Sequence, residues 1–159
     1  MGRSGPLGFV TLRHEIWQNG QLRVTEWQDL VYREDPAPDA EMPQPPRART
    51  DETDCREVGF DSTLLFRYSA LTFNGHRIHY DLDYARDVEG YGGLVVHGPL
   101  LAQLLMLFAV DLSGPLASFS FRATSPLVHF ETAQLCRRGE NMWVRGPDGR
   151  RCMQAVVQS

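Results

Sequence analysis

The sequence predicts an α+β fold in which a curved antiparallel sheet wraps around one long apolar helix. Between Leu100 and Val110 only Gln103 is polar, and a helix that is apolar on every face must be covered on all sides. Four β-rich segments follow this helix, at 116–124, 127–135, 141–146 and 150–158. A sheet rolled around the helix would bury the apolar surface of both, which is the arrangement of the hot-dog fold.

The N-terminal third is predicted to hold a β-hairpin and a linker. Residues 1–33 contain two strand-like segments joined by Asn19-Gly20, a strong hairpin signal because both central residues of the turn need a positive φ. A hairpin alone is marginal in water, so we expect its strands to join a larger sheet. Residues 34–57 are rich in proline and acidic residues, which predicts an extended linker. We therefore expect the hot-dog domain to occupy residues 58–159.

Two further helices are predicted before the long apolar one. The segment 60–73 has apolar residues at helical spacing, with Asp61 or Ser62 available as the N-cap. The segment 81–90 begins with aspartates suited to capping a short helix. The apolar helix has Pro99 near its start, where the missing N–H of proline costs no hydrogen bond.

The composition excludes several classes of function. All 16 basic residues are arginine, which excludes chemistry that depends on a lysine Schiff base or a P-loop. The net charge of −4 and the scattered arginines predict no nucleic-acid partner. No signal peptide or membrane-length apolar segment is found, so we expect a cytoplasmic protein with no membrane partner. The three cysteines, Cys55, Cys136 and Cys152, are far apart in the sequence, which predicts reduced thiols and no disulfide framework.

Two of the five histidines, His76 and His79, stand three residues apart in the polar stretch TFNGHRIHYD, residues 72–81. They could form a metal site, an acid–base site or an ordinary polar loop. Gly75 opposes a continuous helix, and no third ligand occurs at a recognised spacing. The sequence therefore predicts no metal site here and leaves the acid–base and structural interpretations open.

The segments RYSALTFNGHRIHYDLDYAR and EGYGGLVVHGPLLAQLL resemble the MaoC-like hydratases and dehydratases, a family of hot-dog enzymes. The resemblance runs from about residue 9 to the C-terminus. It is strongest to the branch that contains mitochondrial 3-hydroxyacyl-thioester dehydratases and mesaconyl-C4-CoA (3-methylfumaryl-CoA) hydratases. Members of that branch contain two hot-dog repeats, and the hairpin at 1–33 resembles only the closing strands of a first repeat. The broader motif places an aspartate five residues before the histidine, where this chain has Asn74 before His79.

The resemblance implies reversible hydration of a 2-enoyl thioester, without a cofactor or a metal. His79 is the first candidate for proton transfer, because an imidazole titrates near neutral pH. Asn74 cannot act as a base, but its amide can orient a water molecule. The second proton transfer is left to His76 or to His79 itself. We expect the N–H of Gly98, at the start of the apolar helix, to stabilise the thioester oxyanion.

Three further residues are candidates for substrate binding, each with a structural alternative. His97 could contact substrate or hold the loop before the helix. Arg77 could pair with a CoA phosphate or a substrate carboxylate, and a surface ion pair is at least as plausible. Tyr80 could contact substrate or pack in the loop. A cation at the acyl end, such as Arg77 or Arg122, would favour a dicarboxylyl substrate.

The expected partner is an acyl-CoA or acyl-carrier-protein thioester. The pocket of this fold class lies between two hot-dog units, so we expect a homodimer that completes it. One alternative is a non-catalytic thioester-binding module or an inactive subunit that needs a different partner. Another alternative is a hot-dog thioesterase, in which the activated water attacks the carbonyl carbon instead of the β-carbon.

Overall fold

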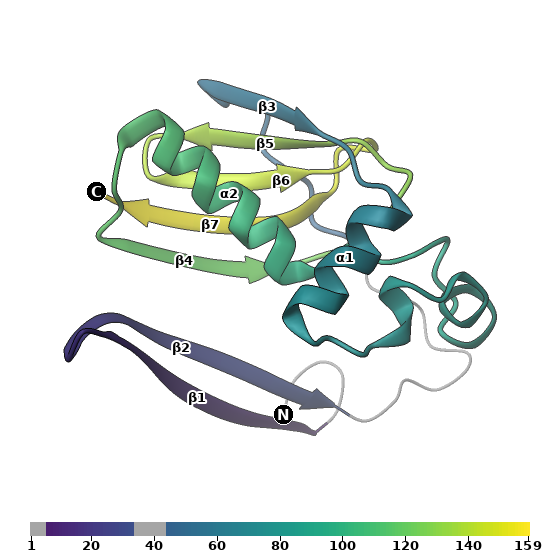
Figure 1. Cartoon of the computed structure of the whole chain (residues 1–159). Helices are drawn as coiled ribbons and strands as arrows, with labels where there is room; N and C mark the ends of the chain where they lie inside the picture. Colours follow the sequence, from purple (N-terminus) through teal and green to yellow (C-terminus); the bar gives the residue numbers. More distant parts are fainter. Residues whose placement is uncertain (1–5, 34–43) are drawn as a thin grey trace. The chain divides into compact units, whose positions relative to one another are not determined.

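A computed structural model describes residues 6–33 and 44–159. The chain divides into two compact units, Met1–Pro43 and Gln44–Ser159, and each is described here by itself (Figure 1). Residues 34–43 of the expected linker lie outside the described residues. Among the described residues, no helix combines the length and the apolar composition needed to cross a bilayer.

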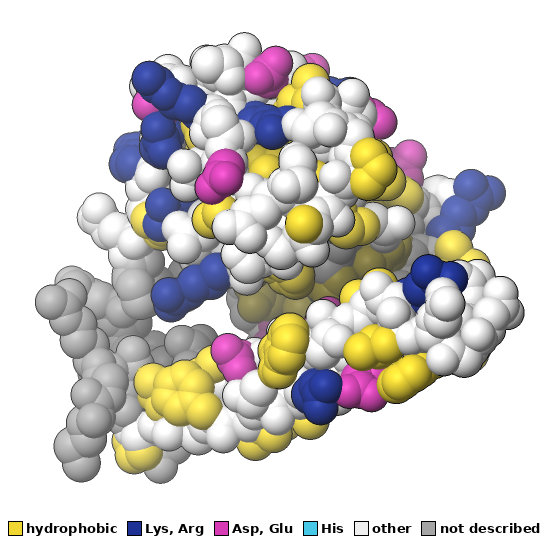
Figure 2. Space-filling view, turned by 90° about the vertical axis from the view of Figure 1, so that its left-hand side faces the viewer, with side chains coloured by type: hydrophobic (Ala, Val, Ile, Leu, Met, Phe, Trp, Pro, Cys, Tyr) yellow, Lys and Arg dark blue, Asp and Glu magenta, His cyan; other side chains and the backbone are white. Residues whose placement is uncertain are grey.

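The first unit contains the predicted hairpin. Strands β1 (Leu7–Gln18) and β2 (Gln21–Arg33) pair antiparallel, and the turn residues Asn19 and Gly20 have φ values of 52° and 72°. These positive φ values confirm the turn that the Asn-Gly pair predicts. The two strands form a sheet of their own, so the expected pairing with a larger sheet is not found among the described residues. Apolar side chains lie at the surface along the hairpin (Figure 2).

The second unit is a five-stranded antiparallel sheet with the long helix α2 across one face (Figure 1). The strand order is β3-β5-β6-β7-β4. Its elements are β3 (Asp54–Val58), α1 (Ser62–Thr72), η1 (Arg77–His79), η2 (Tyr84–Val88), α2 (Gly98–Ser113), β4 (Ser118–Ala123), β5 (Ala133–Arg138), β6 (Asn141–Arg145) and β7 (Arg151–Gln158). The α+β class and the sheet-on-helix arrangement agree with the prediction, except that the segment 127–132, expected to begin a strand, contains a turn and a single antiparallel bridge from Val128 to Val95.

The helix α2 is covered on one side only within this unit, so the expectation that the sheet covers it on all sides is wrong here. Leu101, Leu105 and Phe108 are buried against the sheet. Leu107 and Val110, on another face, are 47% and 38% exposed. A five-stranded sheet curves around one side of a helix, and the remaining apolar face needs a cover from elsewhere.

The two smaller helices begin as predicted. The carboxylate of Asp61 caps α1 by accepting a hydrogen bond from the N–H of Leu64 at 2.7 Å. The helix ends at Phe73, which has a left-handed φ of 54°. The second helix, η2, begins beside Asp81, whose carboxylate accepts a hydrogen bond from the N–H of Tyr84. The loop that carries the two histidines therefore starts at Phe73, where α1 ends, and finishes at the Asp81 cap.

The boundary of the second unit lies earlier than the sequence predicted. The N–H of Ala48 donates to the carbonyl of Gly149 at 3.0 Å, and the N–H of Arg151 donates to Pro46 at 2.7 Å. Strand β3, of which residues 54–57 fall within the expected linker, pairs with β5. Backbone hydrogen bonds hold this segment although it has few apolar side chains. Residues 44–57 therefore belong to the folded unit, which corrects the expected linker end at residue 57.

Candidate active site

The loop 74–80 is tied to the segment that leads into α2, and this contact positions His79. The N–H of Val95 donates to the carbonyl of Ile78 at 2.9 Å. Nδ1 of His79 lies 2.7 Å from the carbonyl oxygen of the same Val95. A carbonyl oxygen can only accept, so Nδ1 of His79 carries the hydrogen and the neutral ring keeps a lone pair on Nε2. This tautomer is the one that a general base at Nε2 requires.

The imidazole ring of His97 stacks on the ring of His79. Their ring centroids are 3.7 Å apart with an interplanar angle of 18°. His97 is fully buried, and its Nε2 lies 2.8 Å from the hydroxyl of Ser69 on α1. Its Nδ1 has no hydrogen-bond partner among the described residues. These contacts lie within the protein, and His97 does not line the hollow described below.

Burial favours the neutral form of both stacked imidazoles. Desolvation lowers the pKa of His79, the hydrogen bond to Val95 opposes this, and the charge of His76 lowers the pKa further. Desolvation also lowers the pKa of His97 to about 4, with a smaller contribution from the charge of His79. A buried imidazole that is neutral at pH 7 can accept a proton without first losing one.

His79 and the start of α2 line the same hollow, which has a volume of about 320 Å³. Gly98 is the first residue of α2, and a Cβ atom added to it would lie 4.0 Å from Cβ of Ala123. The first turn of a helix leaves backbone N–H groups without partners inside the helix, and the helix dipole favours negative charge there. The hollow therefore brings the imidazole of His79 together with the helix start at Gly98, whose backbone N–H is suited to an oxyanion.

The remaining predicted residues do not line this hollow. The side-chain oxygen of Asn74 accepts from the N–H of His76 at 3.0 Å, so this side chain is already engaged within the loop. His76 is exposed, with its ring edge-on to His79 at 5.7 Å. Arg77 pairs with Asp81 at 2.6 Å in the exposed ion pair that we named as its alternative.

Tyr80 has a structural contact of its own. Its hydroxyl donates to the carbonyl of Gly75 at 2.8 Å and closes the loop on itself. Ser69 and the lining residues Tyr91, Thr124 and Ser125 were not predicted from the sequence. The hydroxyl of Ser125 is buried without a partner among the described residues. No local sequence signal marks these positions, because they reach the site only through folding.

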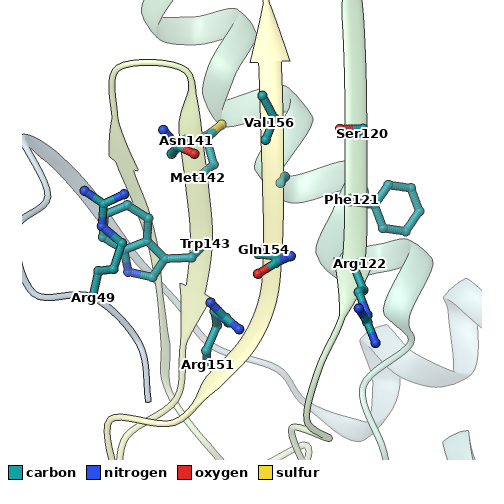
Figure 3. A pocket seen from close by; sticks show the side chains of 11 residues that line it. Arg49, Ser120, Phe121, Arg122, Asn141, Met142, Trp143, Arg151, Gln154 and Val156 are labelled. Atoms are coloured by element: carbon teal, nitrogen blue, oxygen red, sulfur yellow. The ribbon is translucent and has the colours of Figure 1, made fainter. Parts of the chain in front are cut away.

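A second hollow, of about 340 Å³, lies on the sheet face opposite α2 (Figure 3). Its lining includes the guanidinium groups of Arg49, Arg122 and Arg151 and the indole of Trp143. No histidine or carboxylate lines it, so it offers no group that transfers protons near neutral pH. The hollow at His79 is therefore the better candidate for catalysis. Arg122 faces away from that hollow and cannot bind the acyl end of a substrate there.

Comparisons with known proteins identify the family of the chain. A family model described as hydroxyacyl-thioester dehydratase type 2 matches residues 4–129. A mesaconyl-C(4)-CoA hydratase from Chloroflexus aurantiacus is 46% identical over 165 residues, covering 99% of this chain and 58% of the relative. The mitochondrial hydroxyacyl-thioester dehydratase type 2 of Schizosaccharomyces pombe is 35% identical over 86 residues, covering 51% of this chain and 29% of the relative. The chain thus spans less than two thirds of the length of these relatives.

Solved structures share the fold at low sequence identity. HtdX from Mycobacterium tuberculosis has a TM-score of 0.72 at 16% identity, covering 95% of this chain and 62% of that chain. A MaoC-like dehydratase from Phytophthora capsici has a TM-score of 0.70 at 15% identity, covering 98% of this chain and 57% of that chain. These matches confirm the predicted hot-dog fold. Since the family model covers most of the residues, the chain belongs to the hydroxyacyl-thioester dehydratase type 2 family.

Proposed function

We propose that this chain carries the active site of an acyl-thioester hydratase or dehydratase, which adds water reversibly to a 2-enoyl thioester. One observation supports the proposal most strongly. His79, with its Nδ1 held by Val95, lines the same hollow as the N-terminus of α2. Hydration needs a base for water and donors for the thioester oxygen, and this hollow offers both.

We assign both proton transfers to His79. In dehydration, Nε2 takes the α-proton of the 3-hydroxyacyl thioester, and the electron pair moves to form the enolate. The N–H of Gly98 stabilises the negative charge on the thioester oxygen. The resulting imidazolium then gives the same proton to the departing hydroxyl, and the double bond forms as water leaves. His76 does not line the hollow, so a single base that works twice is the simpler assignment.

We infer that the substrate is a CoA thioester, with mesaconyl-C4-CoA as the finer candidate. The hydratase that is 46% identical to this chain is named for that compound. A dicarboxylyl group would require a cation near the acyl end. Arg77 is paired with Asp81 and Arg122 lines the opposite face of the sheet. That cation must therefore come from outside the described lining of this hollow.

We also propose that the site is completed by a second hot-dog unit, supplied by a homodimer or by another subunit. The exposed apolar face of α2, which includes Leu107 and Val110, supports a second unit at this helix. The hairpin of β1 and β2 is assigned to the end of a first repeat, as the sequence resemblance implies. Residues 44–159 then form the catalytic repeat.

The purified chain should lower the absorbance of the enoyl thioester when it is mixed with crotonyl-CoA or mesaconyl-CoA. Release of free CoA, measured with a thiol reagent in the same reaction, would instead indicate a thioesterase. Binding without turnover would favour the alternative of a non-catalytic module. Loss of the enoyl absorbance without thiol release is the result that the proposal requires.

A further inference from the structure

Two cysteines that are distant in the sequence lie opposite each other on two adjacent strands of the sheet. Cys55 on β3 and Cys136 on β5 are direct partners in the antiparallel register, and their Sγ atoms are 3.8 Å apart. Both thiols are free. Facing residues of antiparallel strands have Cα atoms about 4.5–5.5 Å apart, within the range that a disulfide spans. The pair can therefore be bridged by side-chain rotation, without moving the strands.

A metal ion is the competing occupant of this cluster. The carboxylate of Glu52 lies close enough to the two thiols for the three groups to hold an ion. However, the guanidinium of Arg145 already binds both carboxylate oxygens of Glu52. A structural zinc site needs four ligands, and here the positive guanidinium of Arg145 would lie next to the metal ion. The ion pair therefore favours chemistry between the two sulfur atoms over metal binding.

We propose that Cys55 and Cys136 are a thiol modification site that forms a reversible disulfide between β3 and β5. The oxidant is a low-molecular-weight disulfide. The thiolate of Cys55 attacks one sulfur of that disulfide, which forms a mixed disulfide and releases one small thiol. The sulfur of Cys136 then attacks Sγ of Cys55 and releases the second small thiol. The two protein thiols lose two protons and two electrons, and the small disulfide is reduced to two thiols.

The exposure of the two residues sets this order. Cys55 is exposed, whereas Cys136 is fully buried. Burial raises the pKa of Cys136 to about 12, so a soluble oxidant meets its thiolate only rarely. Once Cys55 carries the mixed disulfide, the adjacent Cys136 reacts at a high effective concentration. Cys55 is therefore the attacking residue and Cys136 is the resolving one.

The disulfide would tie down an edge strand that has one neighbour. Strand β3 pairs only with β5 among the described strands, and it leads into α1, which carries the Ser69 that contacts His97. The bond would close a loop between residues 81 positions apart. Loops of this size give large stabilisation in the chain-entropy picture, so oxidation should raise the Tm by about 10 °C.

The test uses the full chain incubated with excess oxidised glutathione and mapped by mass spectrometry without reduction. We expect a peptide that links residues 55 and 136, a loss of two hydrogen atoms per chain, and reversal by dithiothreitol. Cys136→Ala should stop at a mixed glutathione disulfide on Cys55. Cys152→Ser is the matched control and should still form the link, and circular dichroism shows that each variant is folded.

Three results would overturn the proposal. A stable mixed disulfide on Cys55 in the wild-type chain would mean that Cys136 cannot resolve it. A link that involves Cys152 would mean that the register does not direct the reaction. Zinc bound at one ion per chain, and blocking oxidation until it is chelated, would identify the cluster as a metal site.

Discussion

Replacing Ser69 by alanine tests how much its hydrogen bond to His97 contributes to stability and to the geometry of the site. The hydroxyl of Ser69 is the described hydrogen-bond partner of Nε2 of His97, and Nδ1 of His97 has none. Ser69→Ala would leave the fully buried imidazole of His97 without a described hydrogen-bond partner. Losing the partner of a buried polar group costs about 1–3 kcal/mol. The higher helix propensity of alanine returns about 0.5 kcal/mol, so the free energy of unfolding should fall by about 0.5–2.5 kcal/mol.

Urea denaturation followed by circular dichroism measures this change. Ser62→Ala is the matched control, because Ser62 is an exposed serine on the same helix and its loss should change stability by less than about 0.5 kcal/mol. Since His97 stacks on His79, Ser69→Ala should also lower kcat while the substrate KM changes little. A Ser69→Ala chain as stable as the Ser62→Ala chain would refute the described support of His97.

Three other substitutions, at His97, Gly98 and Asn74, have expected outcomes of their own. The pKa of His97 is depressed to about 4 in the folded chain, so the unfolded chain binds a proton at a higher pH and the free energy of unfolding should fall as the pH drops from about 6.5 to about 4. This fall should be smaller in His97→Gln. An equal dependence of unfolding free energy on pH in both chains, measured by urea denaturation, would contradict the prediction. Gly98→Ala has room for its Cβ beside Ala123, so Tm should hold while kcat/KM falls about 10-fold or more through obstruction of the oxyanion site; unchanged turnover would exclude Gly98 from that site. Asn74→Ala removes the acceptor for the N–H of His76 and should cost about 1 kcal/mol, whereas Asn74→Asp keeps an acceptor and should be near wild type in stability; equal losses in both would contradict this role.

Local sequence signals predicted the parts of the fold that local interactions decide. The Asn19-Gly20 turn has the expected positive φ values, and Asp61 caps α1. The long helix α2 begins at Gly98 as its apolar run and Pro99 indicated. These features depend on residues within one turn or one helix, so the sequence contains the physical information directly.

Features decided by distant contacts could not be predicted in this way. Strand β3 has the polar sequence DCREV, which resembles its proline-rich and acidic surroundings. Its backbone hydrogen bonds to β5 decide its structure. The exposed apolar face of α2 could not be predicted for the same reason, because the composition of a helix does not show which element of the fold packs against it. Cys55 and Cys136 looked unrelated in sequence and became neighbours only through the register.

The candidate site was predicted in part. The motif resemblance named His79 and Gly98, which line one hollow. The nearby polar residues Arg77 and Tyr80 are used by the loop itself, because a short polar segment must satisfy its own charges and carbonyl groups. The stack of His97 on His79 could not be predicted, since it joins two segments whose spacing carries no periodic signal.

The hydration rate of the purified chain and of its His79→Gln variant, measured with the same enoyl-CoA, shows whether the imidazole of His79 is the base. Glutamine retains a side-chain donor for Val95 but cannot take a proton. Loss of an acid–base group typically costs 10²–10⁴-fold in rate, so we expect the variant to lose at least about 100-fold in kcat at an unchanged Tm. A variant that hydrates the substrate at close to the wild-type rate would show that the imidazole of His79 is not the base.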